Sequence, residues 1–164
     1  QHPQAQVITF NFEVDERRRT YYNETGHWVH WYNYGRYPAY AIAVRRDAIL
    51  KANVTYSLLY GGGAKYSNGE DSLFLHDCLK KGLRIYADTA LLGKEVYRQS
   101  TWFSGYHEKF FLDRGVLYHD LYGCMAKLFS IRFLWSNRKE MLTTINFRTA
   151  YGLMKQGIRE GKLR

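Results

Sequence analysis

The sequence has few of the residues and patterns that build disulfide scaffolds, metal centres and membrane spans. It contains two cysteines, Cys78 and Cys124, with no CxxC pair and no Cys/His spacing typical of zinc sites. Two isolated cysteines indicate free thiols in a reducing compartment. No apolar run approaches the roughly 18–20 residues that a membrane-spanning helix needs. The sequence therefore gives no sign of a disulfide-stapled domain, a zinc finger or an integral membrane segment.

The composition is that of a folded, basic, aromatic-rich chain. Its 164 residues suit one domain with a single core, and 46% of them are hydrophobic. The net charge of +9 favours phosphates, nucleic acid or anionic lipid as partners, although a solvated charged face would also account for it. With 15 Tyr and 4 Trp, the chain has either a tyrosine-rich core or aromatic surfaces for sugars, bases or lipid headgroups. Both interpretations remain open at this point.

Short β-branched and aromatic runs predict three strands in the first part of the chain. They cover residues 7–14, 27–31 and 39–44. A short helix is predicted to follow in "RDAILKAN", with Asp47 near its start and Asn53 at its end.

The clearest helix is predicted in the stretch "GGGAKYSNGEDSLFLHDCLKKGLRIYAD", residues 61–88. Ser67 and Glu70 have the spacing of a capping box at its start. Gly82 fits a left-handed stop, and "LRIYA" resumes as a strand, which makes an α/β unit. The apolar stripe of the helix consists of Phe74, Leu75, Cys78 and Leu79.

The character of the chain changes at Gly105, after which apolar residues recur at helical spacing with basic residues between them. We therefore expect two parts, an α/β part over residues 1–104 and a helical extension over residues 105–164.

Two adjacent acids, Glu70 and Asp71, stand at the predicted helix start behind the glycine-rich run. Acids in a first helical turn are common, because the helix dipole stabilises them by roughly 0.3–1 kcal/mol. A capping box would explain Glu70, but it explains neither Asp71 nor the glycines, which allow a backbone to approach a ligand closely. The spacings of Walker A and Rossmann phosphate loops are absent.

The order of these segments resembles the C-terminal half of the catalytic domain of family 2 glycosyltransferases, which have the GT-A fold. The basic segment "AVRRDAIL", the glycine-rich loop, Gly-Glu-Asp, a helix, "KKG" and a strand follow one another as in that family. The segment "STWFSGYHEKFFLDRG" resembles a group of its bacterial members. The resemblance covers residues 7–120. It implies an α/β fold in which half of a GT-A-like mixed sheet is flanked by helices and followed by the helical extension.

The resemblance also assigns roles to particular residues. Asp71 matches the general base of an inverting transfer, and Glu70 would orient the acceptor or hold the loop. Trp102 would stack on an acceptor sugar, although a core position suits it equally. The donor sugar would be bordered by Gly61, Gly62, Gly63 and Lys65.

Three departures from the family pattern limit what we expect of this chain. No Asp-x-Asp metal motif occurs, "LLGKEVYRQ" has no histidine where many members have a metal contact, and "QSTW" only partly matches Gln-x-x-Arg-Trp. We therefore expect a portion of an inverting glycosyltransferase that is inactive alone. Its divalent metal, Mg or Mn, would bind only in the full-length parent, and we expect no metal site in this chain.

The expected partners are a nucleotide-sugar donor and a glycan or lipid-linked acceptor, with a cytoplasmic location. One alternative is a basic aromatic nucleic-acid-binding module, suggested by "RRRTYYNETGHWVHWYNYGRY". A further alternative, compatible with the transferase, is peripheral attachment to the inner face of the membrane through the basic amphipathic region 127–138.

Overall fold

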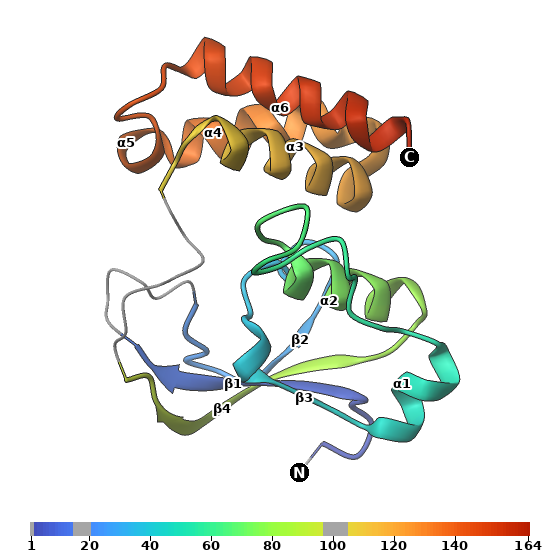
Figure 1. Cartoon of the computed structure of the whole chain (residues 1–164). Coiled ribbons are helices and arrows are strands. Elements are labelled where there is room, and N and C mark those ends of the chain that lie inside the picture. Colours follow the sequence, from blue (N-terminus) through green and yellow to red (C-terminus); the bar gives the residue numbers. More distant parts are fainter. Residues whose placement is uncertain (1, 15–20, 97–104) are drawn as a thin grey trace. The chain divides into compact units, whose positions relative to one another are not determined.

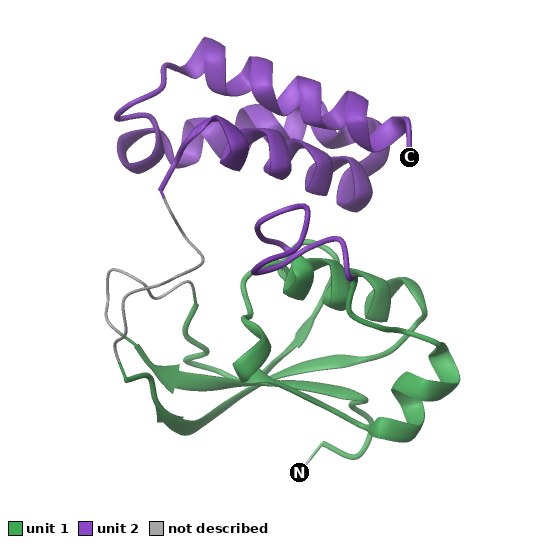
Figure 2. Ribbon diagram, viewed as in Figure 1, with its two compact units in different colours: residues 1–57, 70–99 green, residues 58–69, 100–164 purple. Residues whose placement is uncertain are grey.

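The computed structural model describes residues 2–14, 21–96 and 105–164 of the chain. The chain forms two compact units (Figure 2). The sheet unit comprises residues 1–57 and 70–99, and the helical unit comprises residues 58–69 and 100–164. The sequence analysis placed residues 58–69 in the first part, whereas they belong to the helical unit.

The sheet unit is built on four strands: β1 (Val7–Glu13), β2 (His27–Val29), β3 (Ile42–Val44) and β4 (Ile85–Lys94). Their order is β2-β4-β1-β3, with β1 parallel to β4 and the two edge strands antiparallel to their neighbours. Figure 1 shows α2 (Glu70–Lys80) lying over one face of this sheet. The predicted α/β class with a mixed sheet and flanking helices is therefore confirmed.

The central strand pair has a buried irregularity at Asn11. The register of β1 with β4 shifts on both sides of this residue. The Asn11 side chain donates hydrogen bonds to the carbonyls of Asn23 and Thr89, at 3.0 and 3.1 Å, and accepts one from the Asn23 backbone at 2.9 Å. Because these bonds satisfy polar groups that a shifted ladder leaves unpaired, the segment after β1 is tied to the sheet at this point.

The three strands predicted in the first part are shorter in the structure, the first by one residue. The second ends at Val29, not at residue 31. Residues Ala39–Ala41 form a 3₁₀ turn, η1, and only Ile42–Val44 pair with β1. The Ala41 N–H donates to the Pro38 carbonyl at 2.9 Å, so this group is used within the turn and not in the ladder.

Both predicted helices of the sheet unit are present. The first, α1 (Arg46–Ala52), ends at Asn53, which is left-handed with φ 52°. The second, α2, buries Phe74, Leu75 and Cys78 as expected, and Gly82 after it has φ 77°. The predicted capping box is wrong, because α2 begins at Glu70 and Ser67 therefore lies two residues before the N-cap position.

The helical unit contains α3 (Glu108–Tyr122), the 3₁₀ turn η2 (Gly123–Met125), α4 (Ala126–Ser136), α5 (Arg138–Met141) and α6 (Phe147–Lys162). The side chain of Asn146 caps α6 by accepting the N–H of Thr149 at 2.9 Å. The fully buried large side chains of these helices are Phe111, Val116, Leu117, Leu134, Met154 and Ile158.

Glycines allow the backbones of α3 and α6 to touch. A Cβ at Gly115 would collide with the backbone of Met154, and one at Gly157 would collide with the backbone of Leu112. Since glycine is the one residue without this atom, the two helices approach more closely here than other side chains would permit. Over the ranges that the structure describes, no helix combines the length and the apolar character required to cross a bilayer.

Candidate functional site

Asp71 is an ionisable group of the sheet unit in an unusual environment. It lies in the first turn of α2, beside Glu70, and its Oδ1 is buried without a hydrogen-bond partner among the described residues. Burial, followed by the charge of Glu70, raises the pKa of Asp71 to about 6, against a hydrogen bond from the Ala39 backbone that lowers it. The start of a helix favours an anion, so desolvation outweighs the dipole at this carboxyl.

The surroundings of Asp71 come from three segments of the sheet unit. Ala39 approaches it from the turn before β3, and Gly35 lies against Ser72, since a Cβ on Gly35 would be 3.8 Å from the Ser72 hydroxyl. Tyr56 stacks on Phe74 with ring centroids 4.3 Å apart. Burial, and then nearby acids led by Asp71, raise the pKa of Tyr56 to about 12. Asp71 is thus a half-buried carboxyl with a neutral phenol near it.

The glycine-rich run forms a tight turn within the helical unit. Gly61 and Gly63 have φ of 113° and 83°, values that favour glycine. The Gly61 N–H donates to the Tyr66 carbonyl at 2.9 Å, and the Tyr66 N–H donates to the Leu59 carbonyl at 3.0 Å. Residues 58–69, which we call the glycine loop, therefore close on themselves between Tyr60 and Tyr66.

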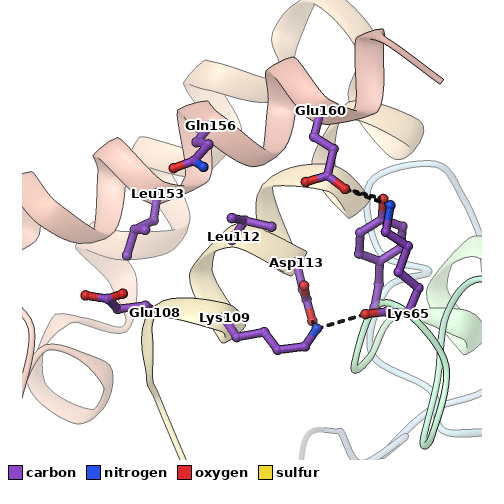
Figure 3. Close-up of a pocket in the computed structure, with 9 residues that line it drawn as sticks. Lys65, Glu108, Lys109, Leu112, Asp113, Leu153, Gln156 and Glu160 are labelled. Carbon is purple, nitrogen blue, oxygen red and sulfur yellow. Dashed lines mark hydrogen bonds and ion pairs between the residues drawn. The ribbon is translucent and has the colours of Figure 1, made fainter.

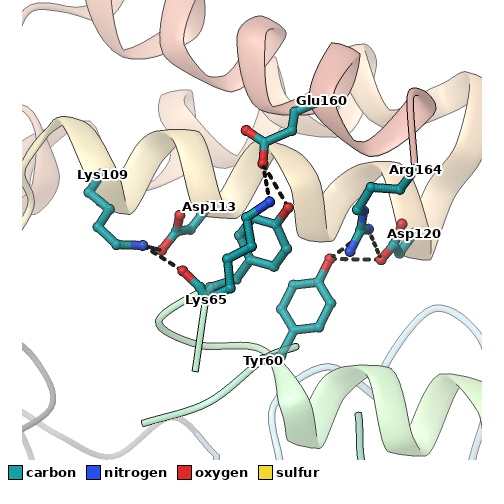
Figure 4. Close-up of polar contacts among 8 residues, drawn as sticks. Tyr60, Lys65, Lys109, Asp113, Asp120, Glu160 and Arg164 are labelled. Carbon is teal, nitrogen blue, oxygen red and sulfur yellow. Dashed lines mark hydrogen bonds and ion pairs between the residues drawn. The ribbon is translucent and has the colours of Figure 1, made fainter. Parts of the chain in front are cut away.

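Three carboxylates hold the glycine loop on the helices (Figure 4). Glu160 of α6 accepts from the Tyr66 hydroxyl at 2.8 Å and pairs with Lys65 at 2.9 Å. Asp113 of α3 accepts from the Ser67 backbone at 2.8 Å. Asp120 of α3 accepts from the Tyr60 hydroxyl at 2.7 Å and pairs with Arg164 at 2.6 Å.

The hydrogen-bond partners of two of these acids lower their pKa values. The hydrogen bonds from Lys65 and Tyr66 lower the pKa of Glu160. Burial would raise the pKa of Asp120, but hydrogen bonds from Tyr60, Arg164 and His119 outweigh it and lower that pKa. Both carboxylates are therefore ionised at neutral pH, as their contacts require.

A cavity of about 390 Å³ opens in the helical unit between the glycine loop, α3 and α6 (Figure 3). Lys109 donates to Asp113 at 2.7 Å and to the Lys65 carbonyl at 2.8 Å. Each lysine of the cavity thus already has a carboxylate partner, which weakens the case for a phosphate site here. The lining residues are Lys65, Tyr66, Glu108, Lys109, Leu112, Asp113, Leu153, Gln156 and Glu160.

The structure distributes the predicted site residues between the units. Glu70 and Asp71 are together on α2 of the sheet unit, while Gly61, Gly62, Gly63 and Lys65 share the glycine loop of the helical unit. Lys65 is paired with Glu160, a contact that the sequence analysis did not anticipate. Trp102 and the segment "QSTW" lie outside the described residues.

No group of three or more His, Cys, Asp or Glu side chains that could hold a metal ion is found where the structure describes the chain. The residues described do not fit the metal that the resemblance implies. That the metal binds elsewhere in a longer protein stays a prediction.

Sequence reasoning missed Asp113, Asp120 and Glu160, the acids that bind the glycine loop. The one local signal was the spacing of Lys109 and Asp113, four residues apart and therefore neighbours on a helix. The other partners are separated by dozens of residues, 94 in the case of Tyr66 and Glu160, and no local sequence pattern indicates such pairs.

Comparison with known proteins gives no assignment. No protein-family model matches the chain, and neither the curated proteins nor the solved structures contain a match.

Proposed function

We propose that this chain carries the acceptor side of an inverting glycosyltransferase, which moves a sugar from a nucleotide-sugar to a hydroxyl of a glycan or lipid-linked acceptor. The finer fold assignment, half of a GT-A-like domain, belongs to the same proposal. Its support is the order of the sequence segments, together with the raised pKa and the unpartnered Oδ1 of Asp71.

In the proposed reaction Asp71 is the general base. As the acceptor oxygen forms a bond to the anomeric carbon, its proton passes to the Asp71 carboxylate. The bond from that carbon to the phosphate oxygen breaks, and the nucleoside diphosphate leaves with the electron pair. In-line attack inverts the anomeric centre. The residues described here supply the proton acceptor and no metal, so no step is assigned to a metal.

The observation that carries the proposal is the pKa of Asp71, raised to about 6, together with its unpartnered Oδ1. A general base works best when its pKa lies near the operating pH, since it is then ionised yet still holds a proton well. An acid that only capped the helix would direct its oxygens at the free N–H groups of the first turn. Oδ1 of Asp71 makes no such contact among the described residues.

The test uses the protein that contains this chain, expressed at full length. Release of nucleoside diphosphate is measured with a panel of UDP-, GDP- and dTDP-sugars, with and without sugar acceptors, and NMR follows the anomeric configuration of the product. We expect acceptor-dependent release with inversion. Asp71→Asn is expected to lower it about 100-fold or more while donor binding persists.

Asp77→Asn is the matched control, because Asp77 lies on the same helix and its side chain is 43% exposed. Its turnover should stay near the wild-type value. Retention of the anomeric configuration, equal losses in both variants, or no binding of any nucleotide-sugar would contradict the proposal.

One observation favours the nucleic-acid alternative enough to test it. Trp31 and Tyr32 are 72% and 67% exposed, with ring centroids 5.6 Å apart in an edge-to-face contact. Exposed rings can stack on bases as well as on sugars. Salt-dependent binding of arbitrary RNA, lost in Trp31→Ala with Tyr32→Ala, would favour this alternative over the transferase.

A further inference from the structure

Helix α4 is apolar on two sides, and only one of them is covered within the helical unit. Ala126, Ser130 and Leu134, spaced four residues apart, are buried against the other helices. Leu128, Ile131 and Trp135, at spacings of three and four, are 61%, 42% and 63% exposed. At about 100° per residue, the exposed residues form a stripe on a different side of the helix from the buried ones.

Met125, in the turn before α4, extends this stripe at 49% exposure. We call Met125, Leu128, Ile131 and Trp135 the outer face of α4. Large side chains of this kind occur singly on most protein surfaces. Three along one side of α4, with Met125 in the turn before it, form an apolar strip, and such a strip marks a contact surface.

The charged residues that neighbour the outer face in sequence are all positive. Between residues 121 and 139 the sequence has four basic residues and neither Asp nor Glu. Lys127 and Arg132 are exposed neighbours of the stripe on α4 itself. The Arg138 guanidinium lies 4.9 Å from the centre of the Trp135 ring, so the aromatic ring and a cation share one end of the strip.

This combination selects one kind of partner. An apolar strip alone would fit any hydrophobic surface, but uninterrupted positive charge along it complements an anionic one. Leucine, isoleucine and tryptophan enter the boundary between headgroups and acyl chains, while lysine and arginine remain at the phosphates. We propose that the outer face of α4 binds the surface of an anionic lipid bilayer, lying in the interface without crossing it. This inference does not depend on the transferase proposal.

The experiment measures sedimentation of the full chain with vesicles of phosphatidylcholine alone and of phosphatidylcholine mixed with phosphatidylglycerol. We expect binding that needs phosphatidylglycerol and weakens with salt. Brominated acyl chains should quench part of the tryptophan fluorescence, and Trp135→Phe should remove that part. Leu128→Glu should weaken binding by about tenfold or more, because it removes a leucine that the bilayer would bury and adds a negative charge that the anionic surface repels.

Leu163→Glu is the matched control, since Leu163 is 88% exposed in the same unit but lies outside the outer face. It should keep most of the wild-type affinity. Lys127→Gln with Arg132→Gln should weaken binding more than Arg159→Gln with Lys162→Gln, a pair with the same charge change on α6. Ile131→Gln provides a second apolar variant, and thermal melting checks that every variant is folded.

Three results would overturn the proposal. The wild-type chain could fail to sediment with the anionic vesicles. Leu128→Glu and Leu163→Glu could lose the same affinity, which would make the binding a matter of net charge alone. Light scattering could instead show an oligomer that Leu128→Glu dissociates without any vesicle binding, which would make the outer face an interface between copies of this chain.

Discussion

The backbone N–H of Ser67 donates a 2.8 Å hydrogen bond to Oδ2 of Asp113, a residue 46 positions later on α3. Asp113 also accepts from Lys109, and its side chain is only 2% exposed. Because a buried carboxylate binds the end of the glycine loop, the conformation of that loop depends on α3 as well as on its own sequence.

Replacing Asp113 should loosen the glycine loop. In Asp113→Ala the Ser67 N–H loses its acceptor, and we expect the free energy of unfolding to fall by about 1–3 kcal/mol. Amide exchange at Tyr66 and Ser67 should accelerate more than exchange within α6. Glu108→Gln, an exposed acid one turn earlier on α3, should change stability by a few tenths of a kcal/mol, consistent with exposed surface substitutions. Unchanged exchange at Ser67 in Asp113→Ala would contradict this role.

Local sequence patterns predicted the apolar stripe and the end of α2 correctly, but not its start. The stripe of Phe74, Leu75 and Cys78 and the stop at Gly82 are short-range features, and the structure has them where the sequence predicted them. The capping box failed because α2 begins too late for it and the backbone N–H of Ser67 donates to Asp113 on α3. Tertiary contacts of this kind override a local motif whose contribution is of the order of 1 kcal/mol.

In the candidate site, too, local patterns predicted some features and missed those that depend on other segments. Glu70 and Asp71 were recognised from their position at a helix start, but the environment of Asp71, where burial raises its pKa, includes Ala39 and Tyr56 from other segments of the chain. The strand predicted over residues 39–44 was too long for a local reason. "AYA" has the composition of a strand, yet a hydrogen bond to Pro38 closes it into a turn.

The contact between α3 and α6 should not tolerate an added methyl group at Gly115. A Cβ there would meet the Met154 backbone, which cannot rotate away, so Gly115→Ala is expected to cost about 1–3 kcal/mol or more. Gly152→Ala on α6 is the control, because open space surrounds its Cβ position. There alanine should stabilise by about 0.5–1 kcal/mol through its helix propensity. Urea unfolding curves distinguish the two, and equal effects would show that α3 and α6 are not in close contact.

The two cysteines should differ sharply in reactivity. Both are free thiols, Cys124 exposed and Cys78 fully buried. Burial, followed by the charge of Asp77, raises the pKa of Cys78 to about 12, so little thiolate forms. With a thiol reagent under native conditions we expect rapid modification of one cysteine, identified as Cys124 by mass spectrometry. Modification of Cys78 should wait for unfolding, and fast native labelling of it would mean that the core around α2 opens readily.

The pKa of Asp71 also predicts how stability changes with pH. It is raised from 3.8 to about 6 in the folded state, so the folded chain holds this proton more tightly than the unfolded chain. The stabilisation that results from this more tightly held proton is complete below pH 4 and is lost as the pH rises to about 6. Because the side chain is only partly buried, we expect a decline of about 1 kcal/mol. Asp71→Asn should lack this decline while Asp77→Asn keeps it, as unfolding curves between pH 4 and 7 would show. Parallel curves for wild type and Asp71→Asn would contradict the shift.

The rate of transfer should depend on the ionisation of Asp71. If Asp71 is the base, kcat/KM of the full-length protein should rise with pH through about 6, because only the ionised form accepts the acceptor proton. Glu70→Gln keeps the size of its side chain but removes one negative charge beside Asp71. Glu70 raises the pKa of Asp71, so this variant should move the rise to lower pH with a modest loss of rate. In Asp71→Asn the residual rate, lower by about 100-fold or more, should no longer show the rise. A wild-type profile without a rise near pH 6, or a residual Asp71→Asn rate that still follows it, would assign the proton transfer to another group and leave Asp71 with the structural role of an acid in the first turn of a helix.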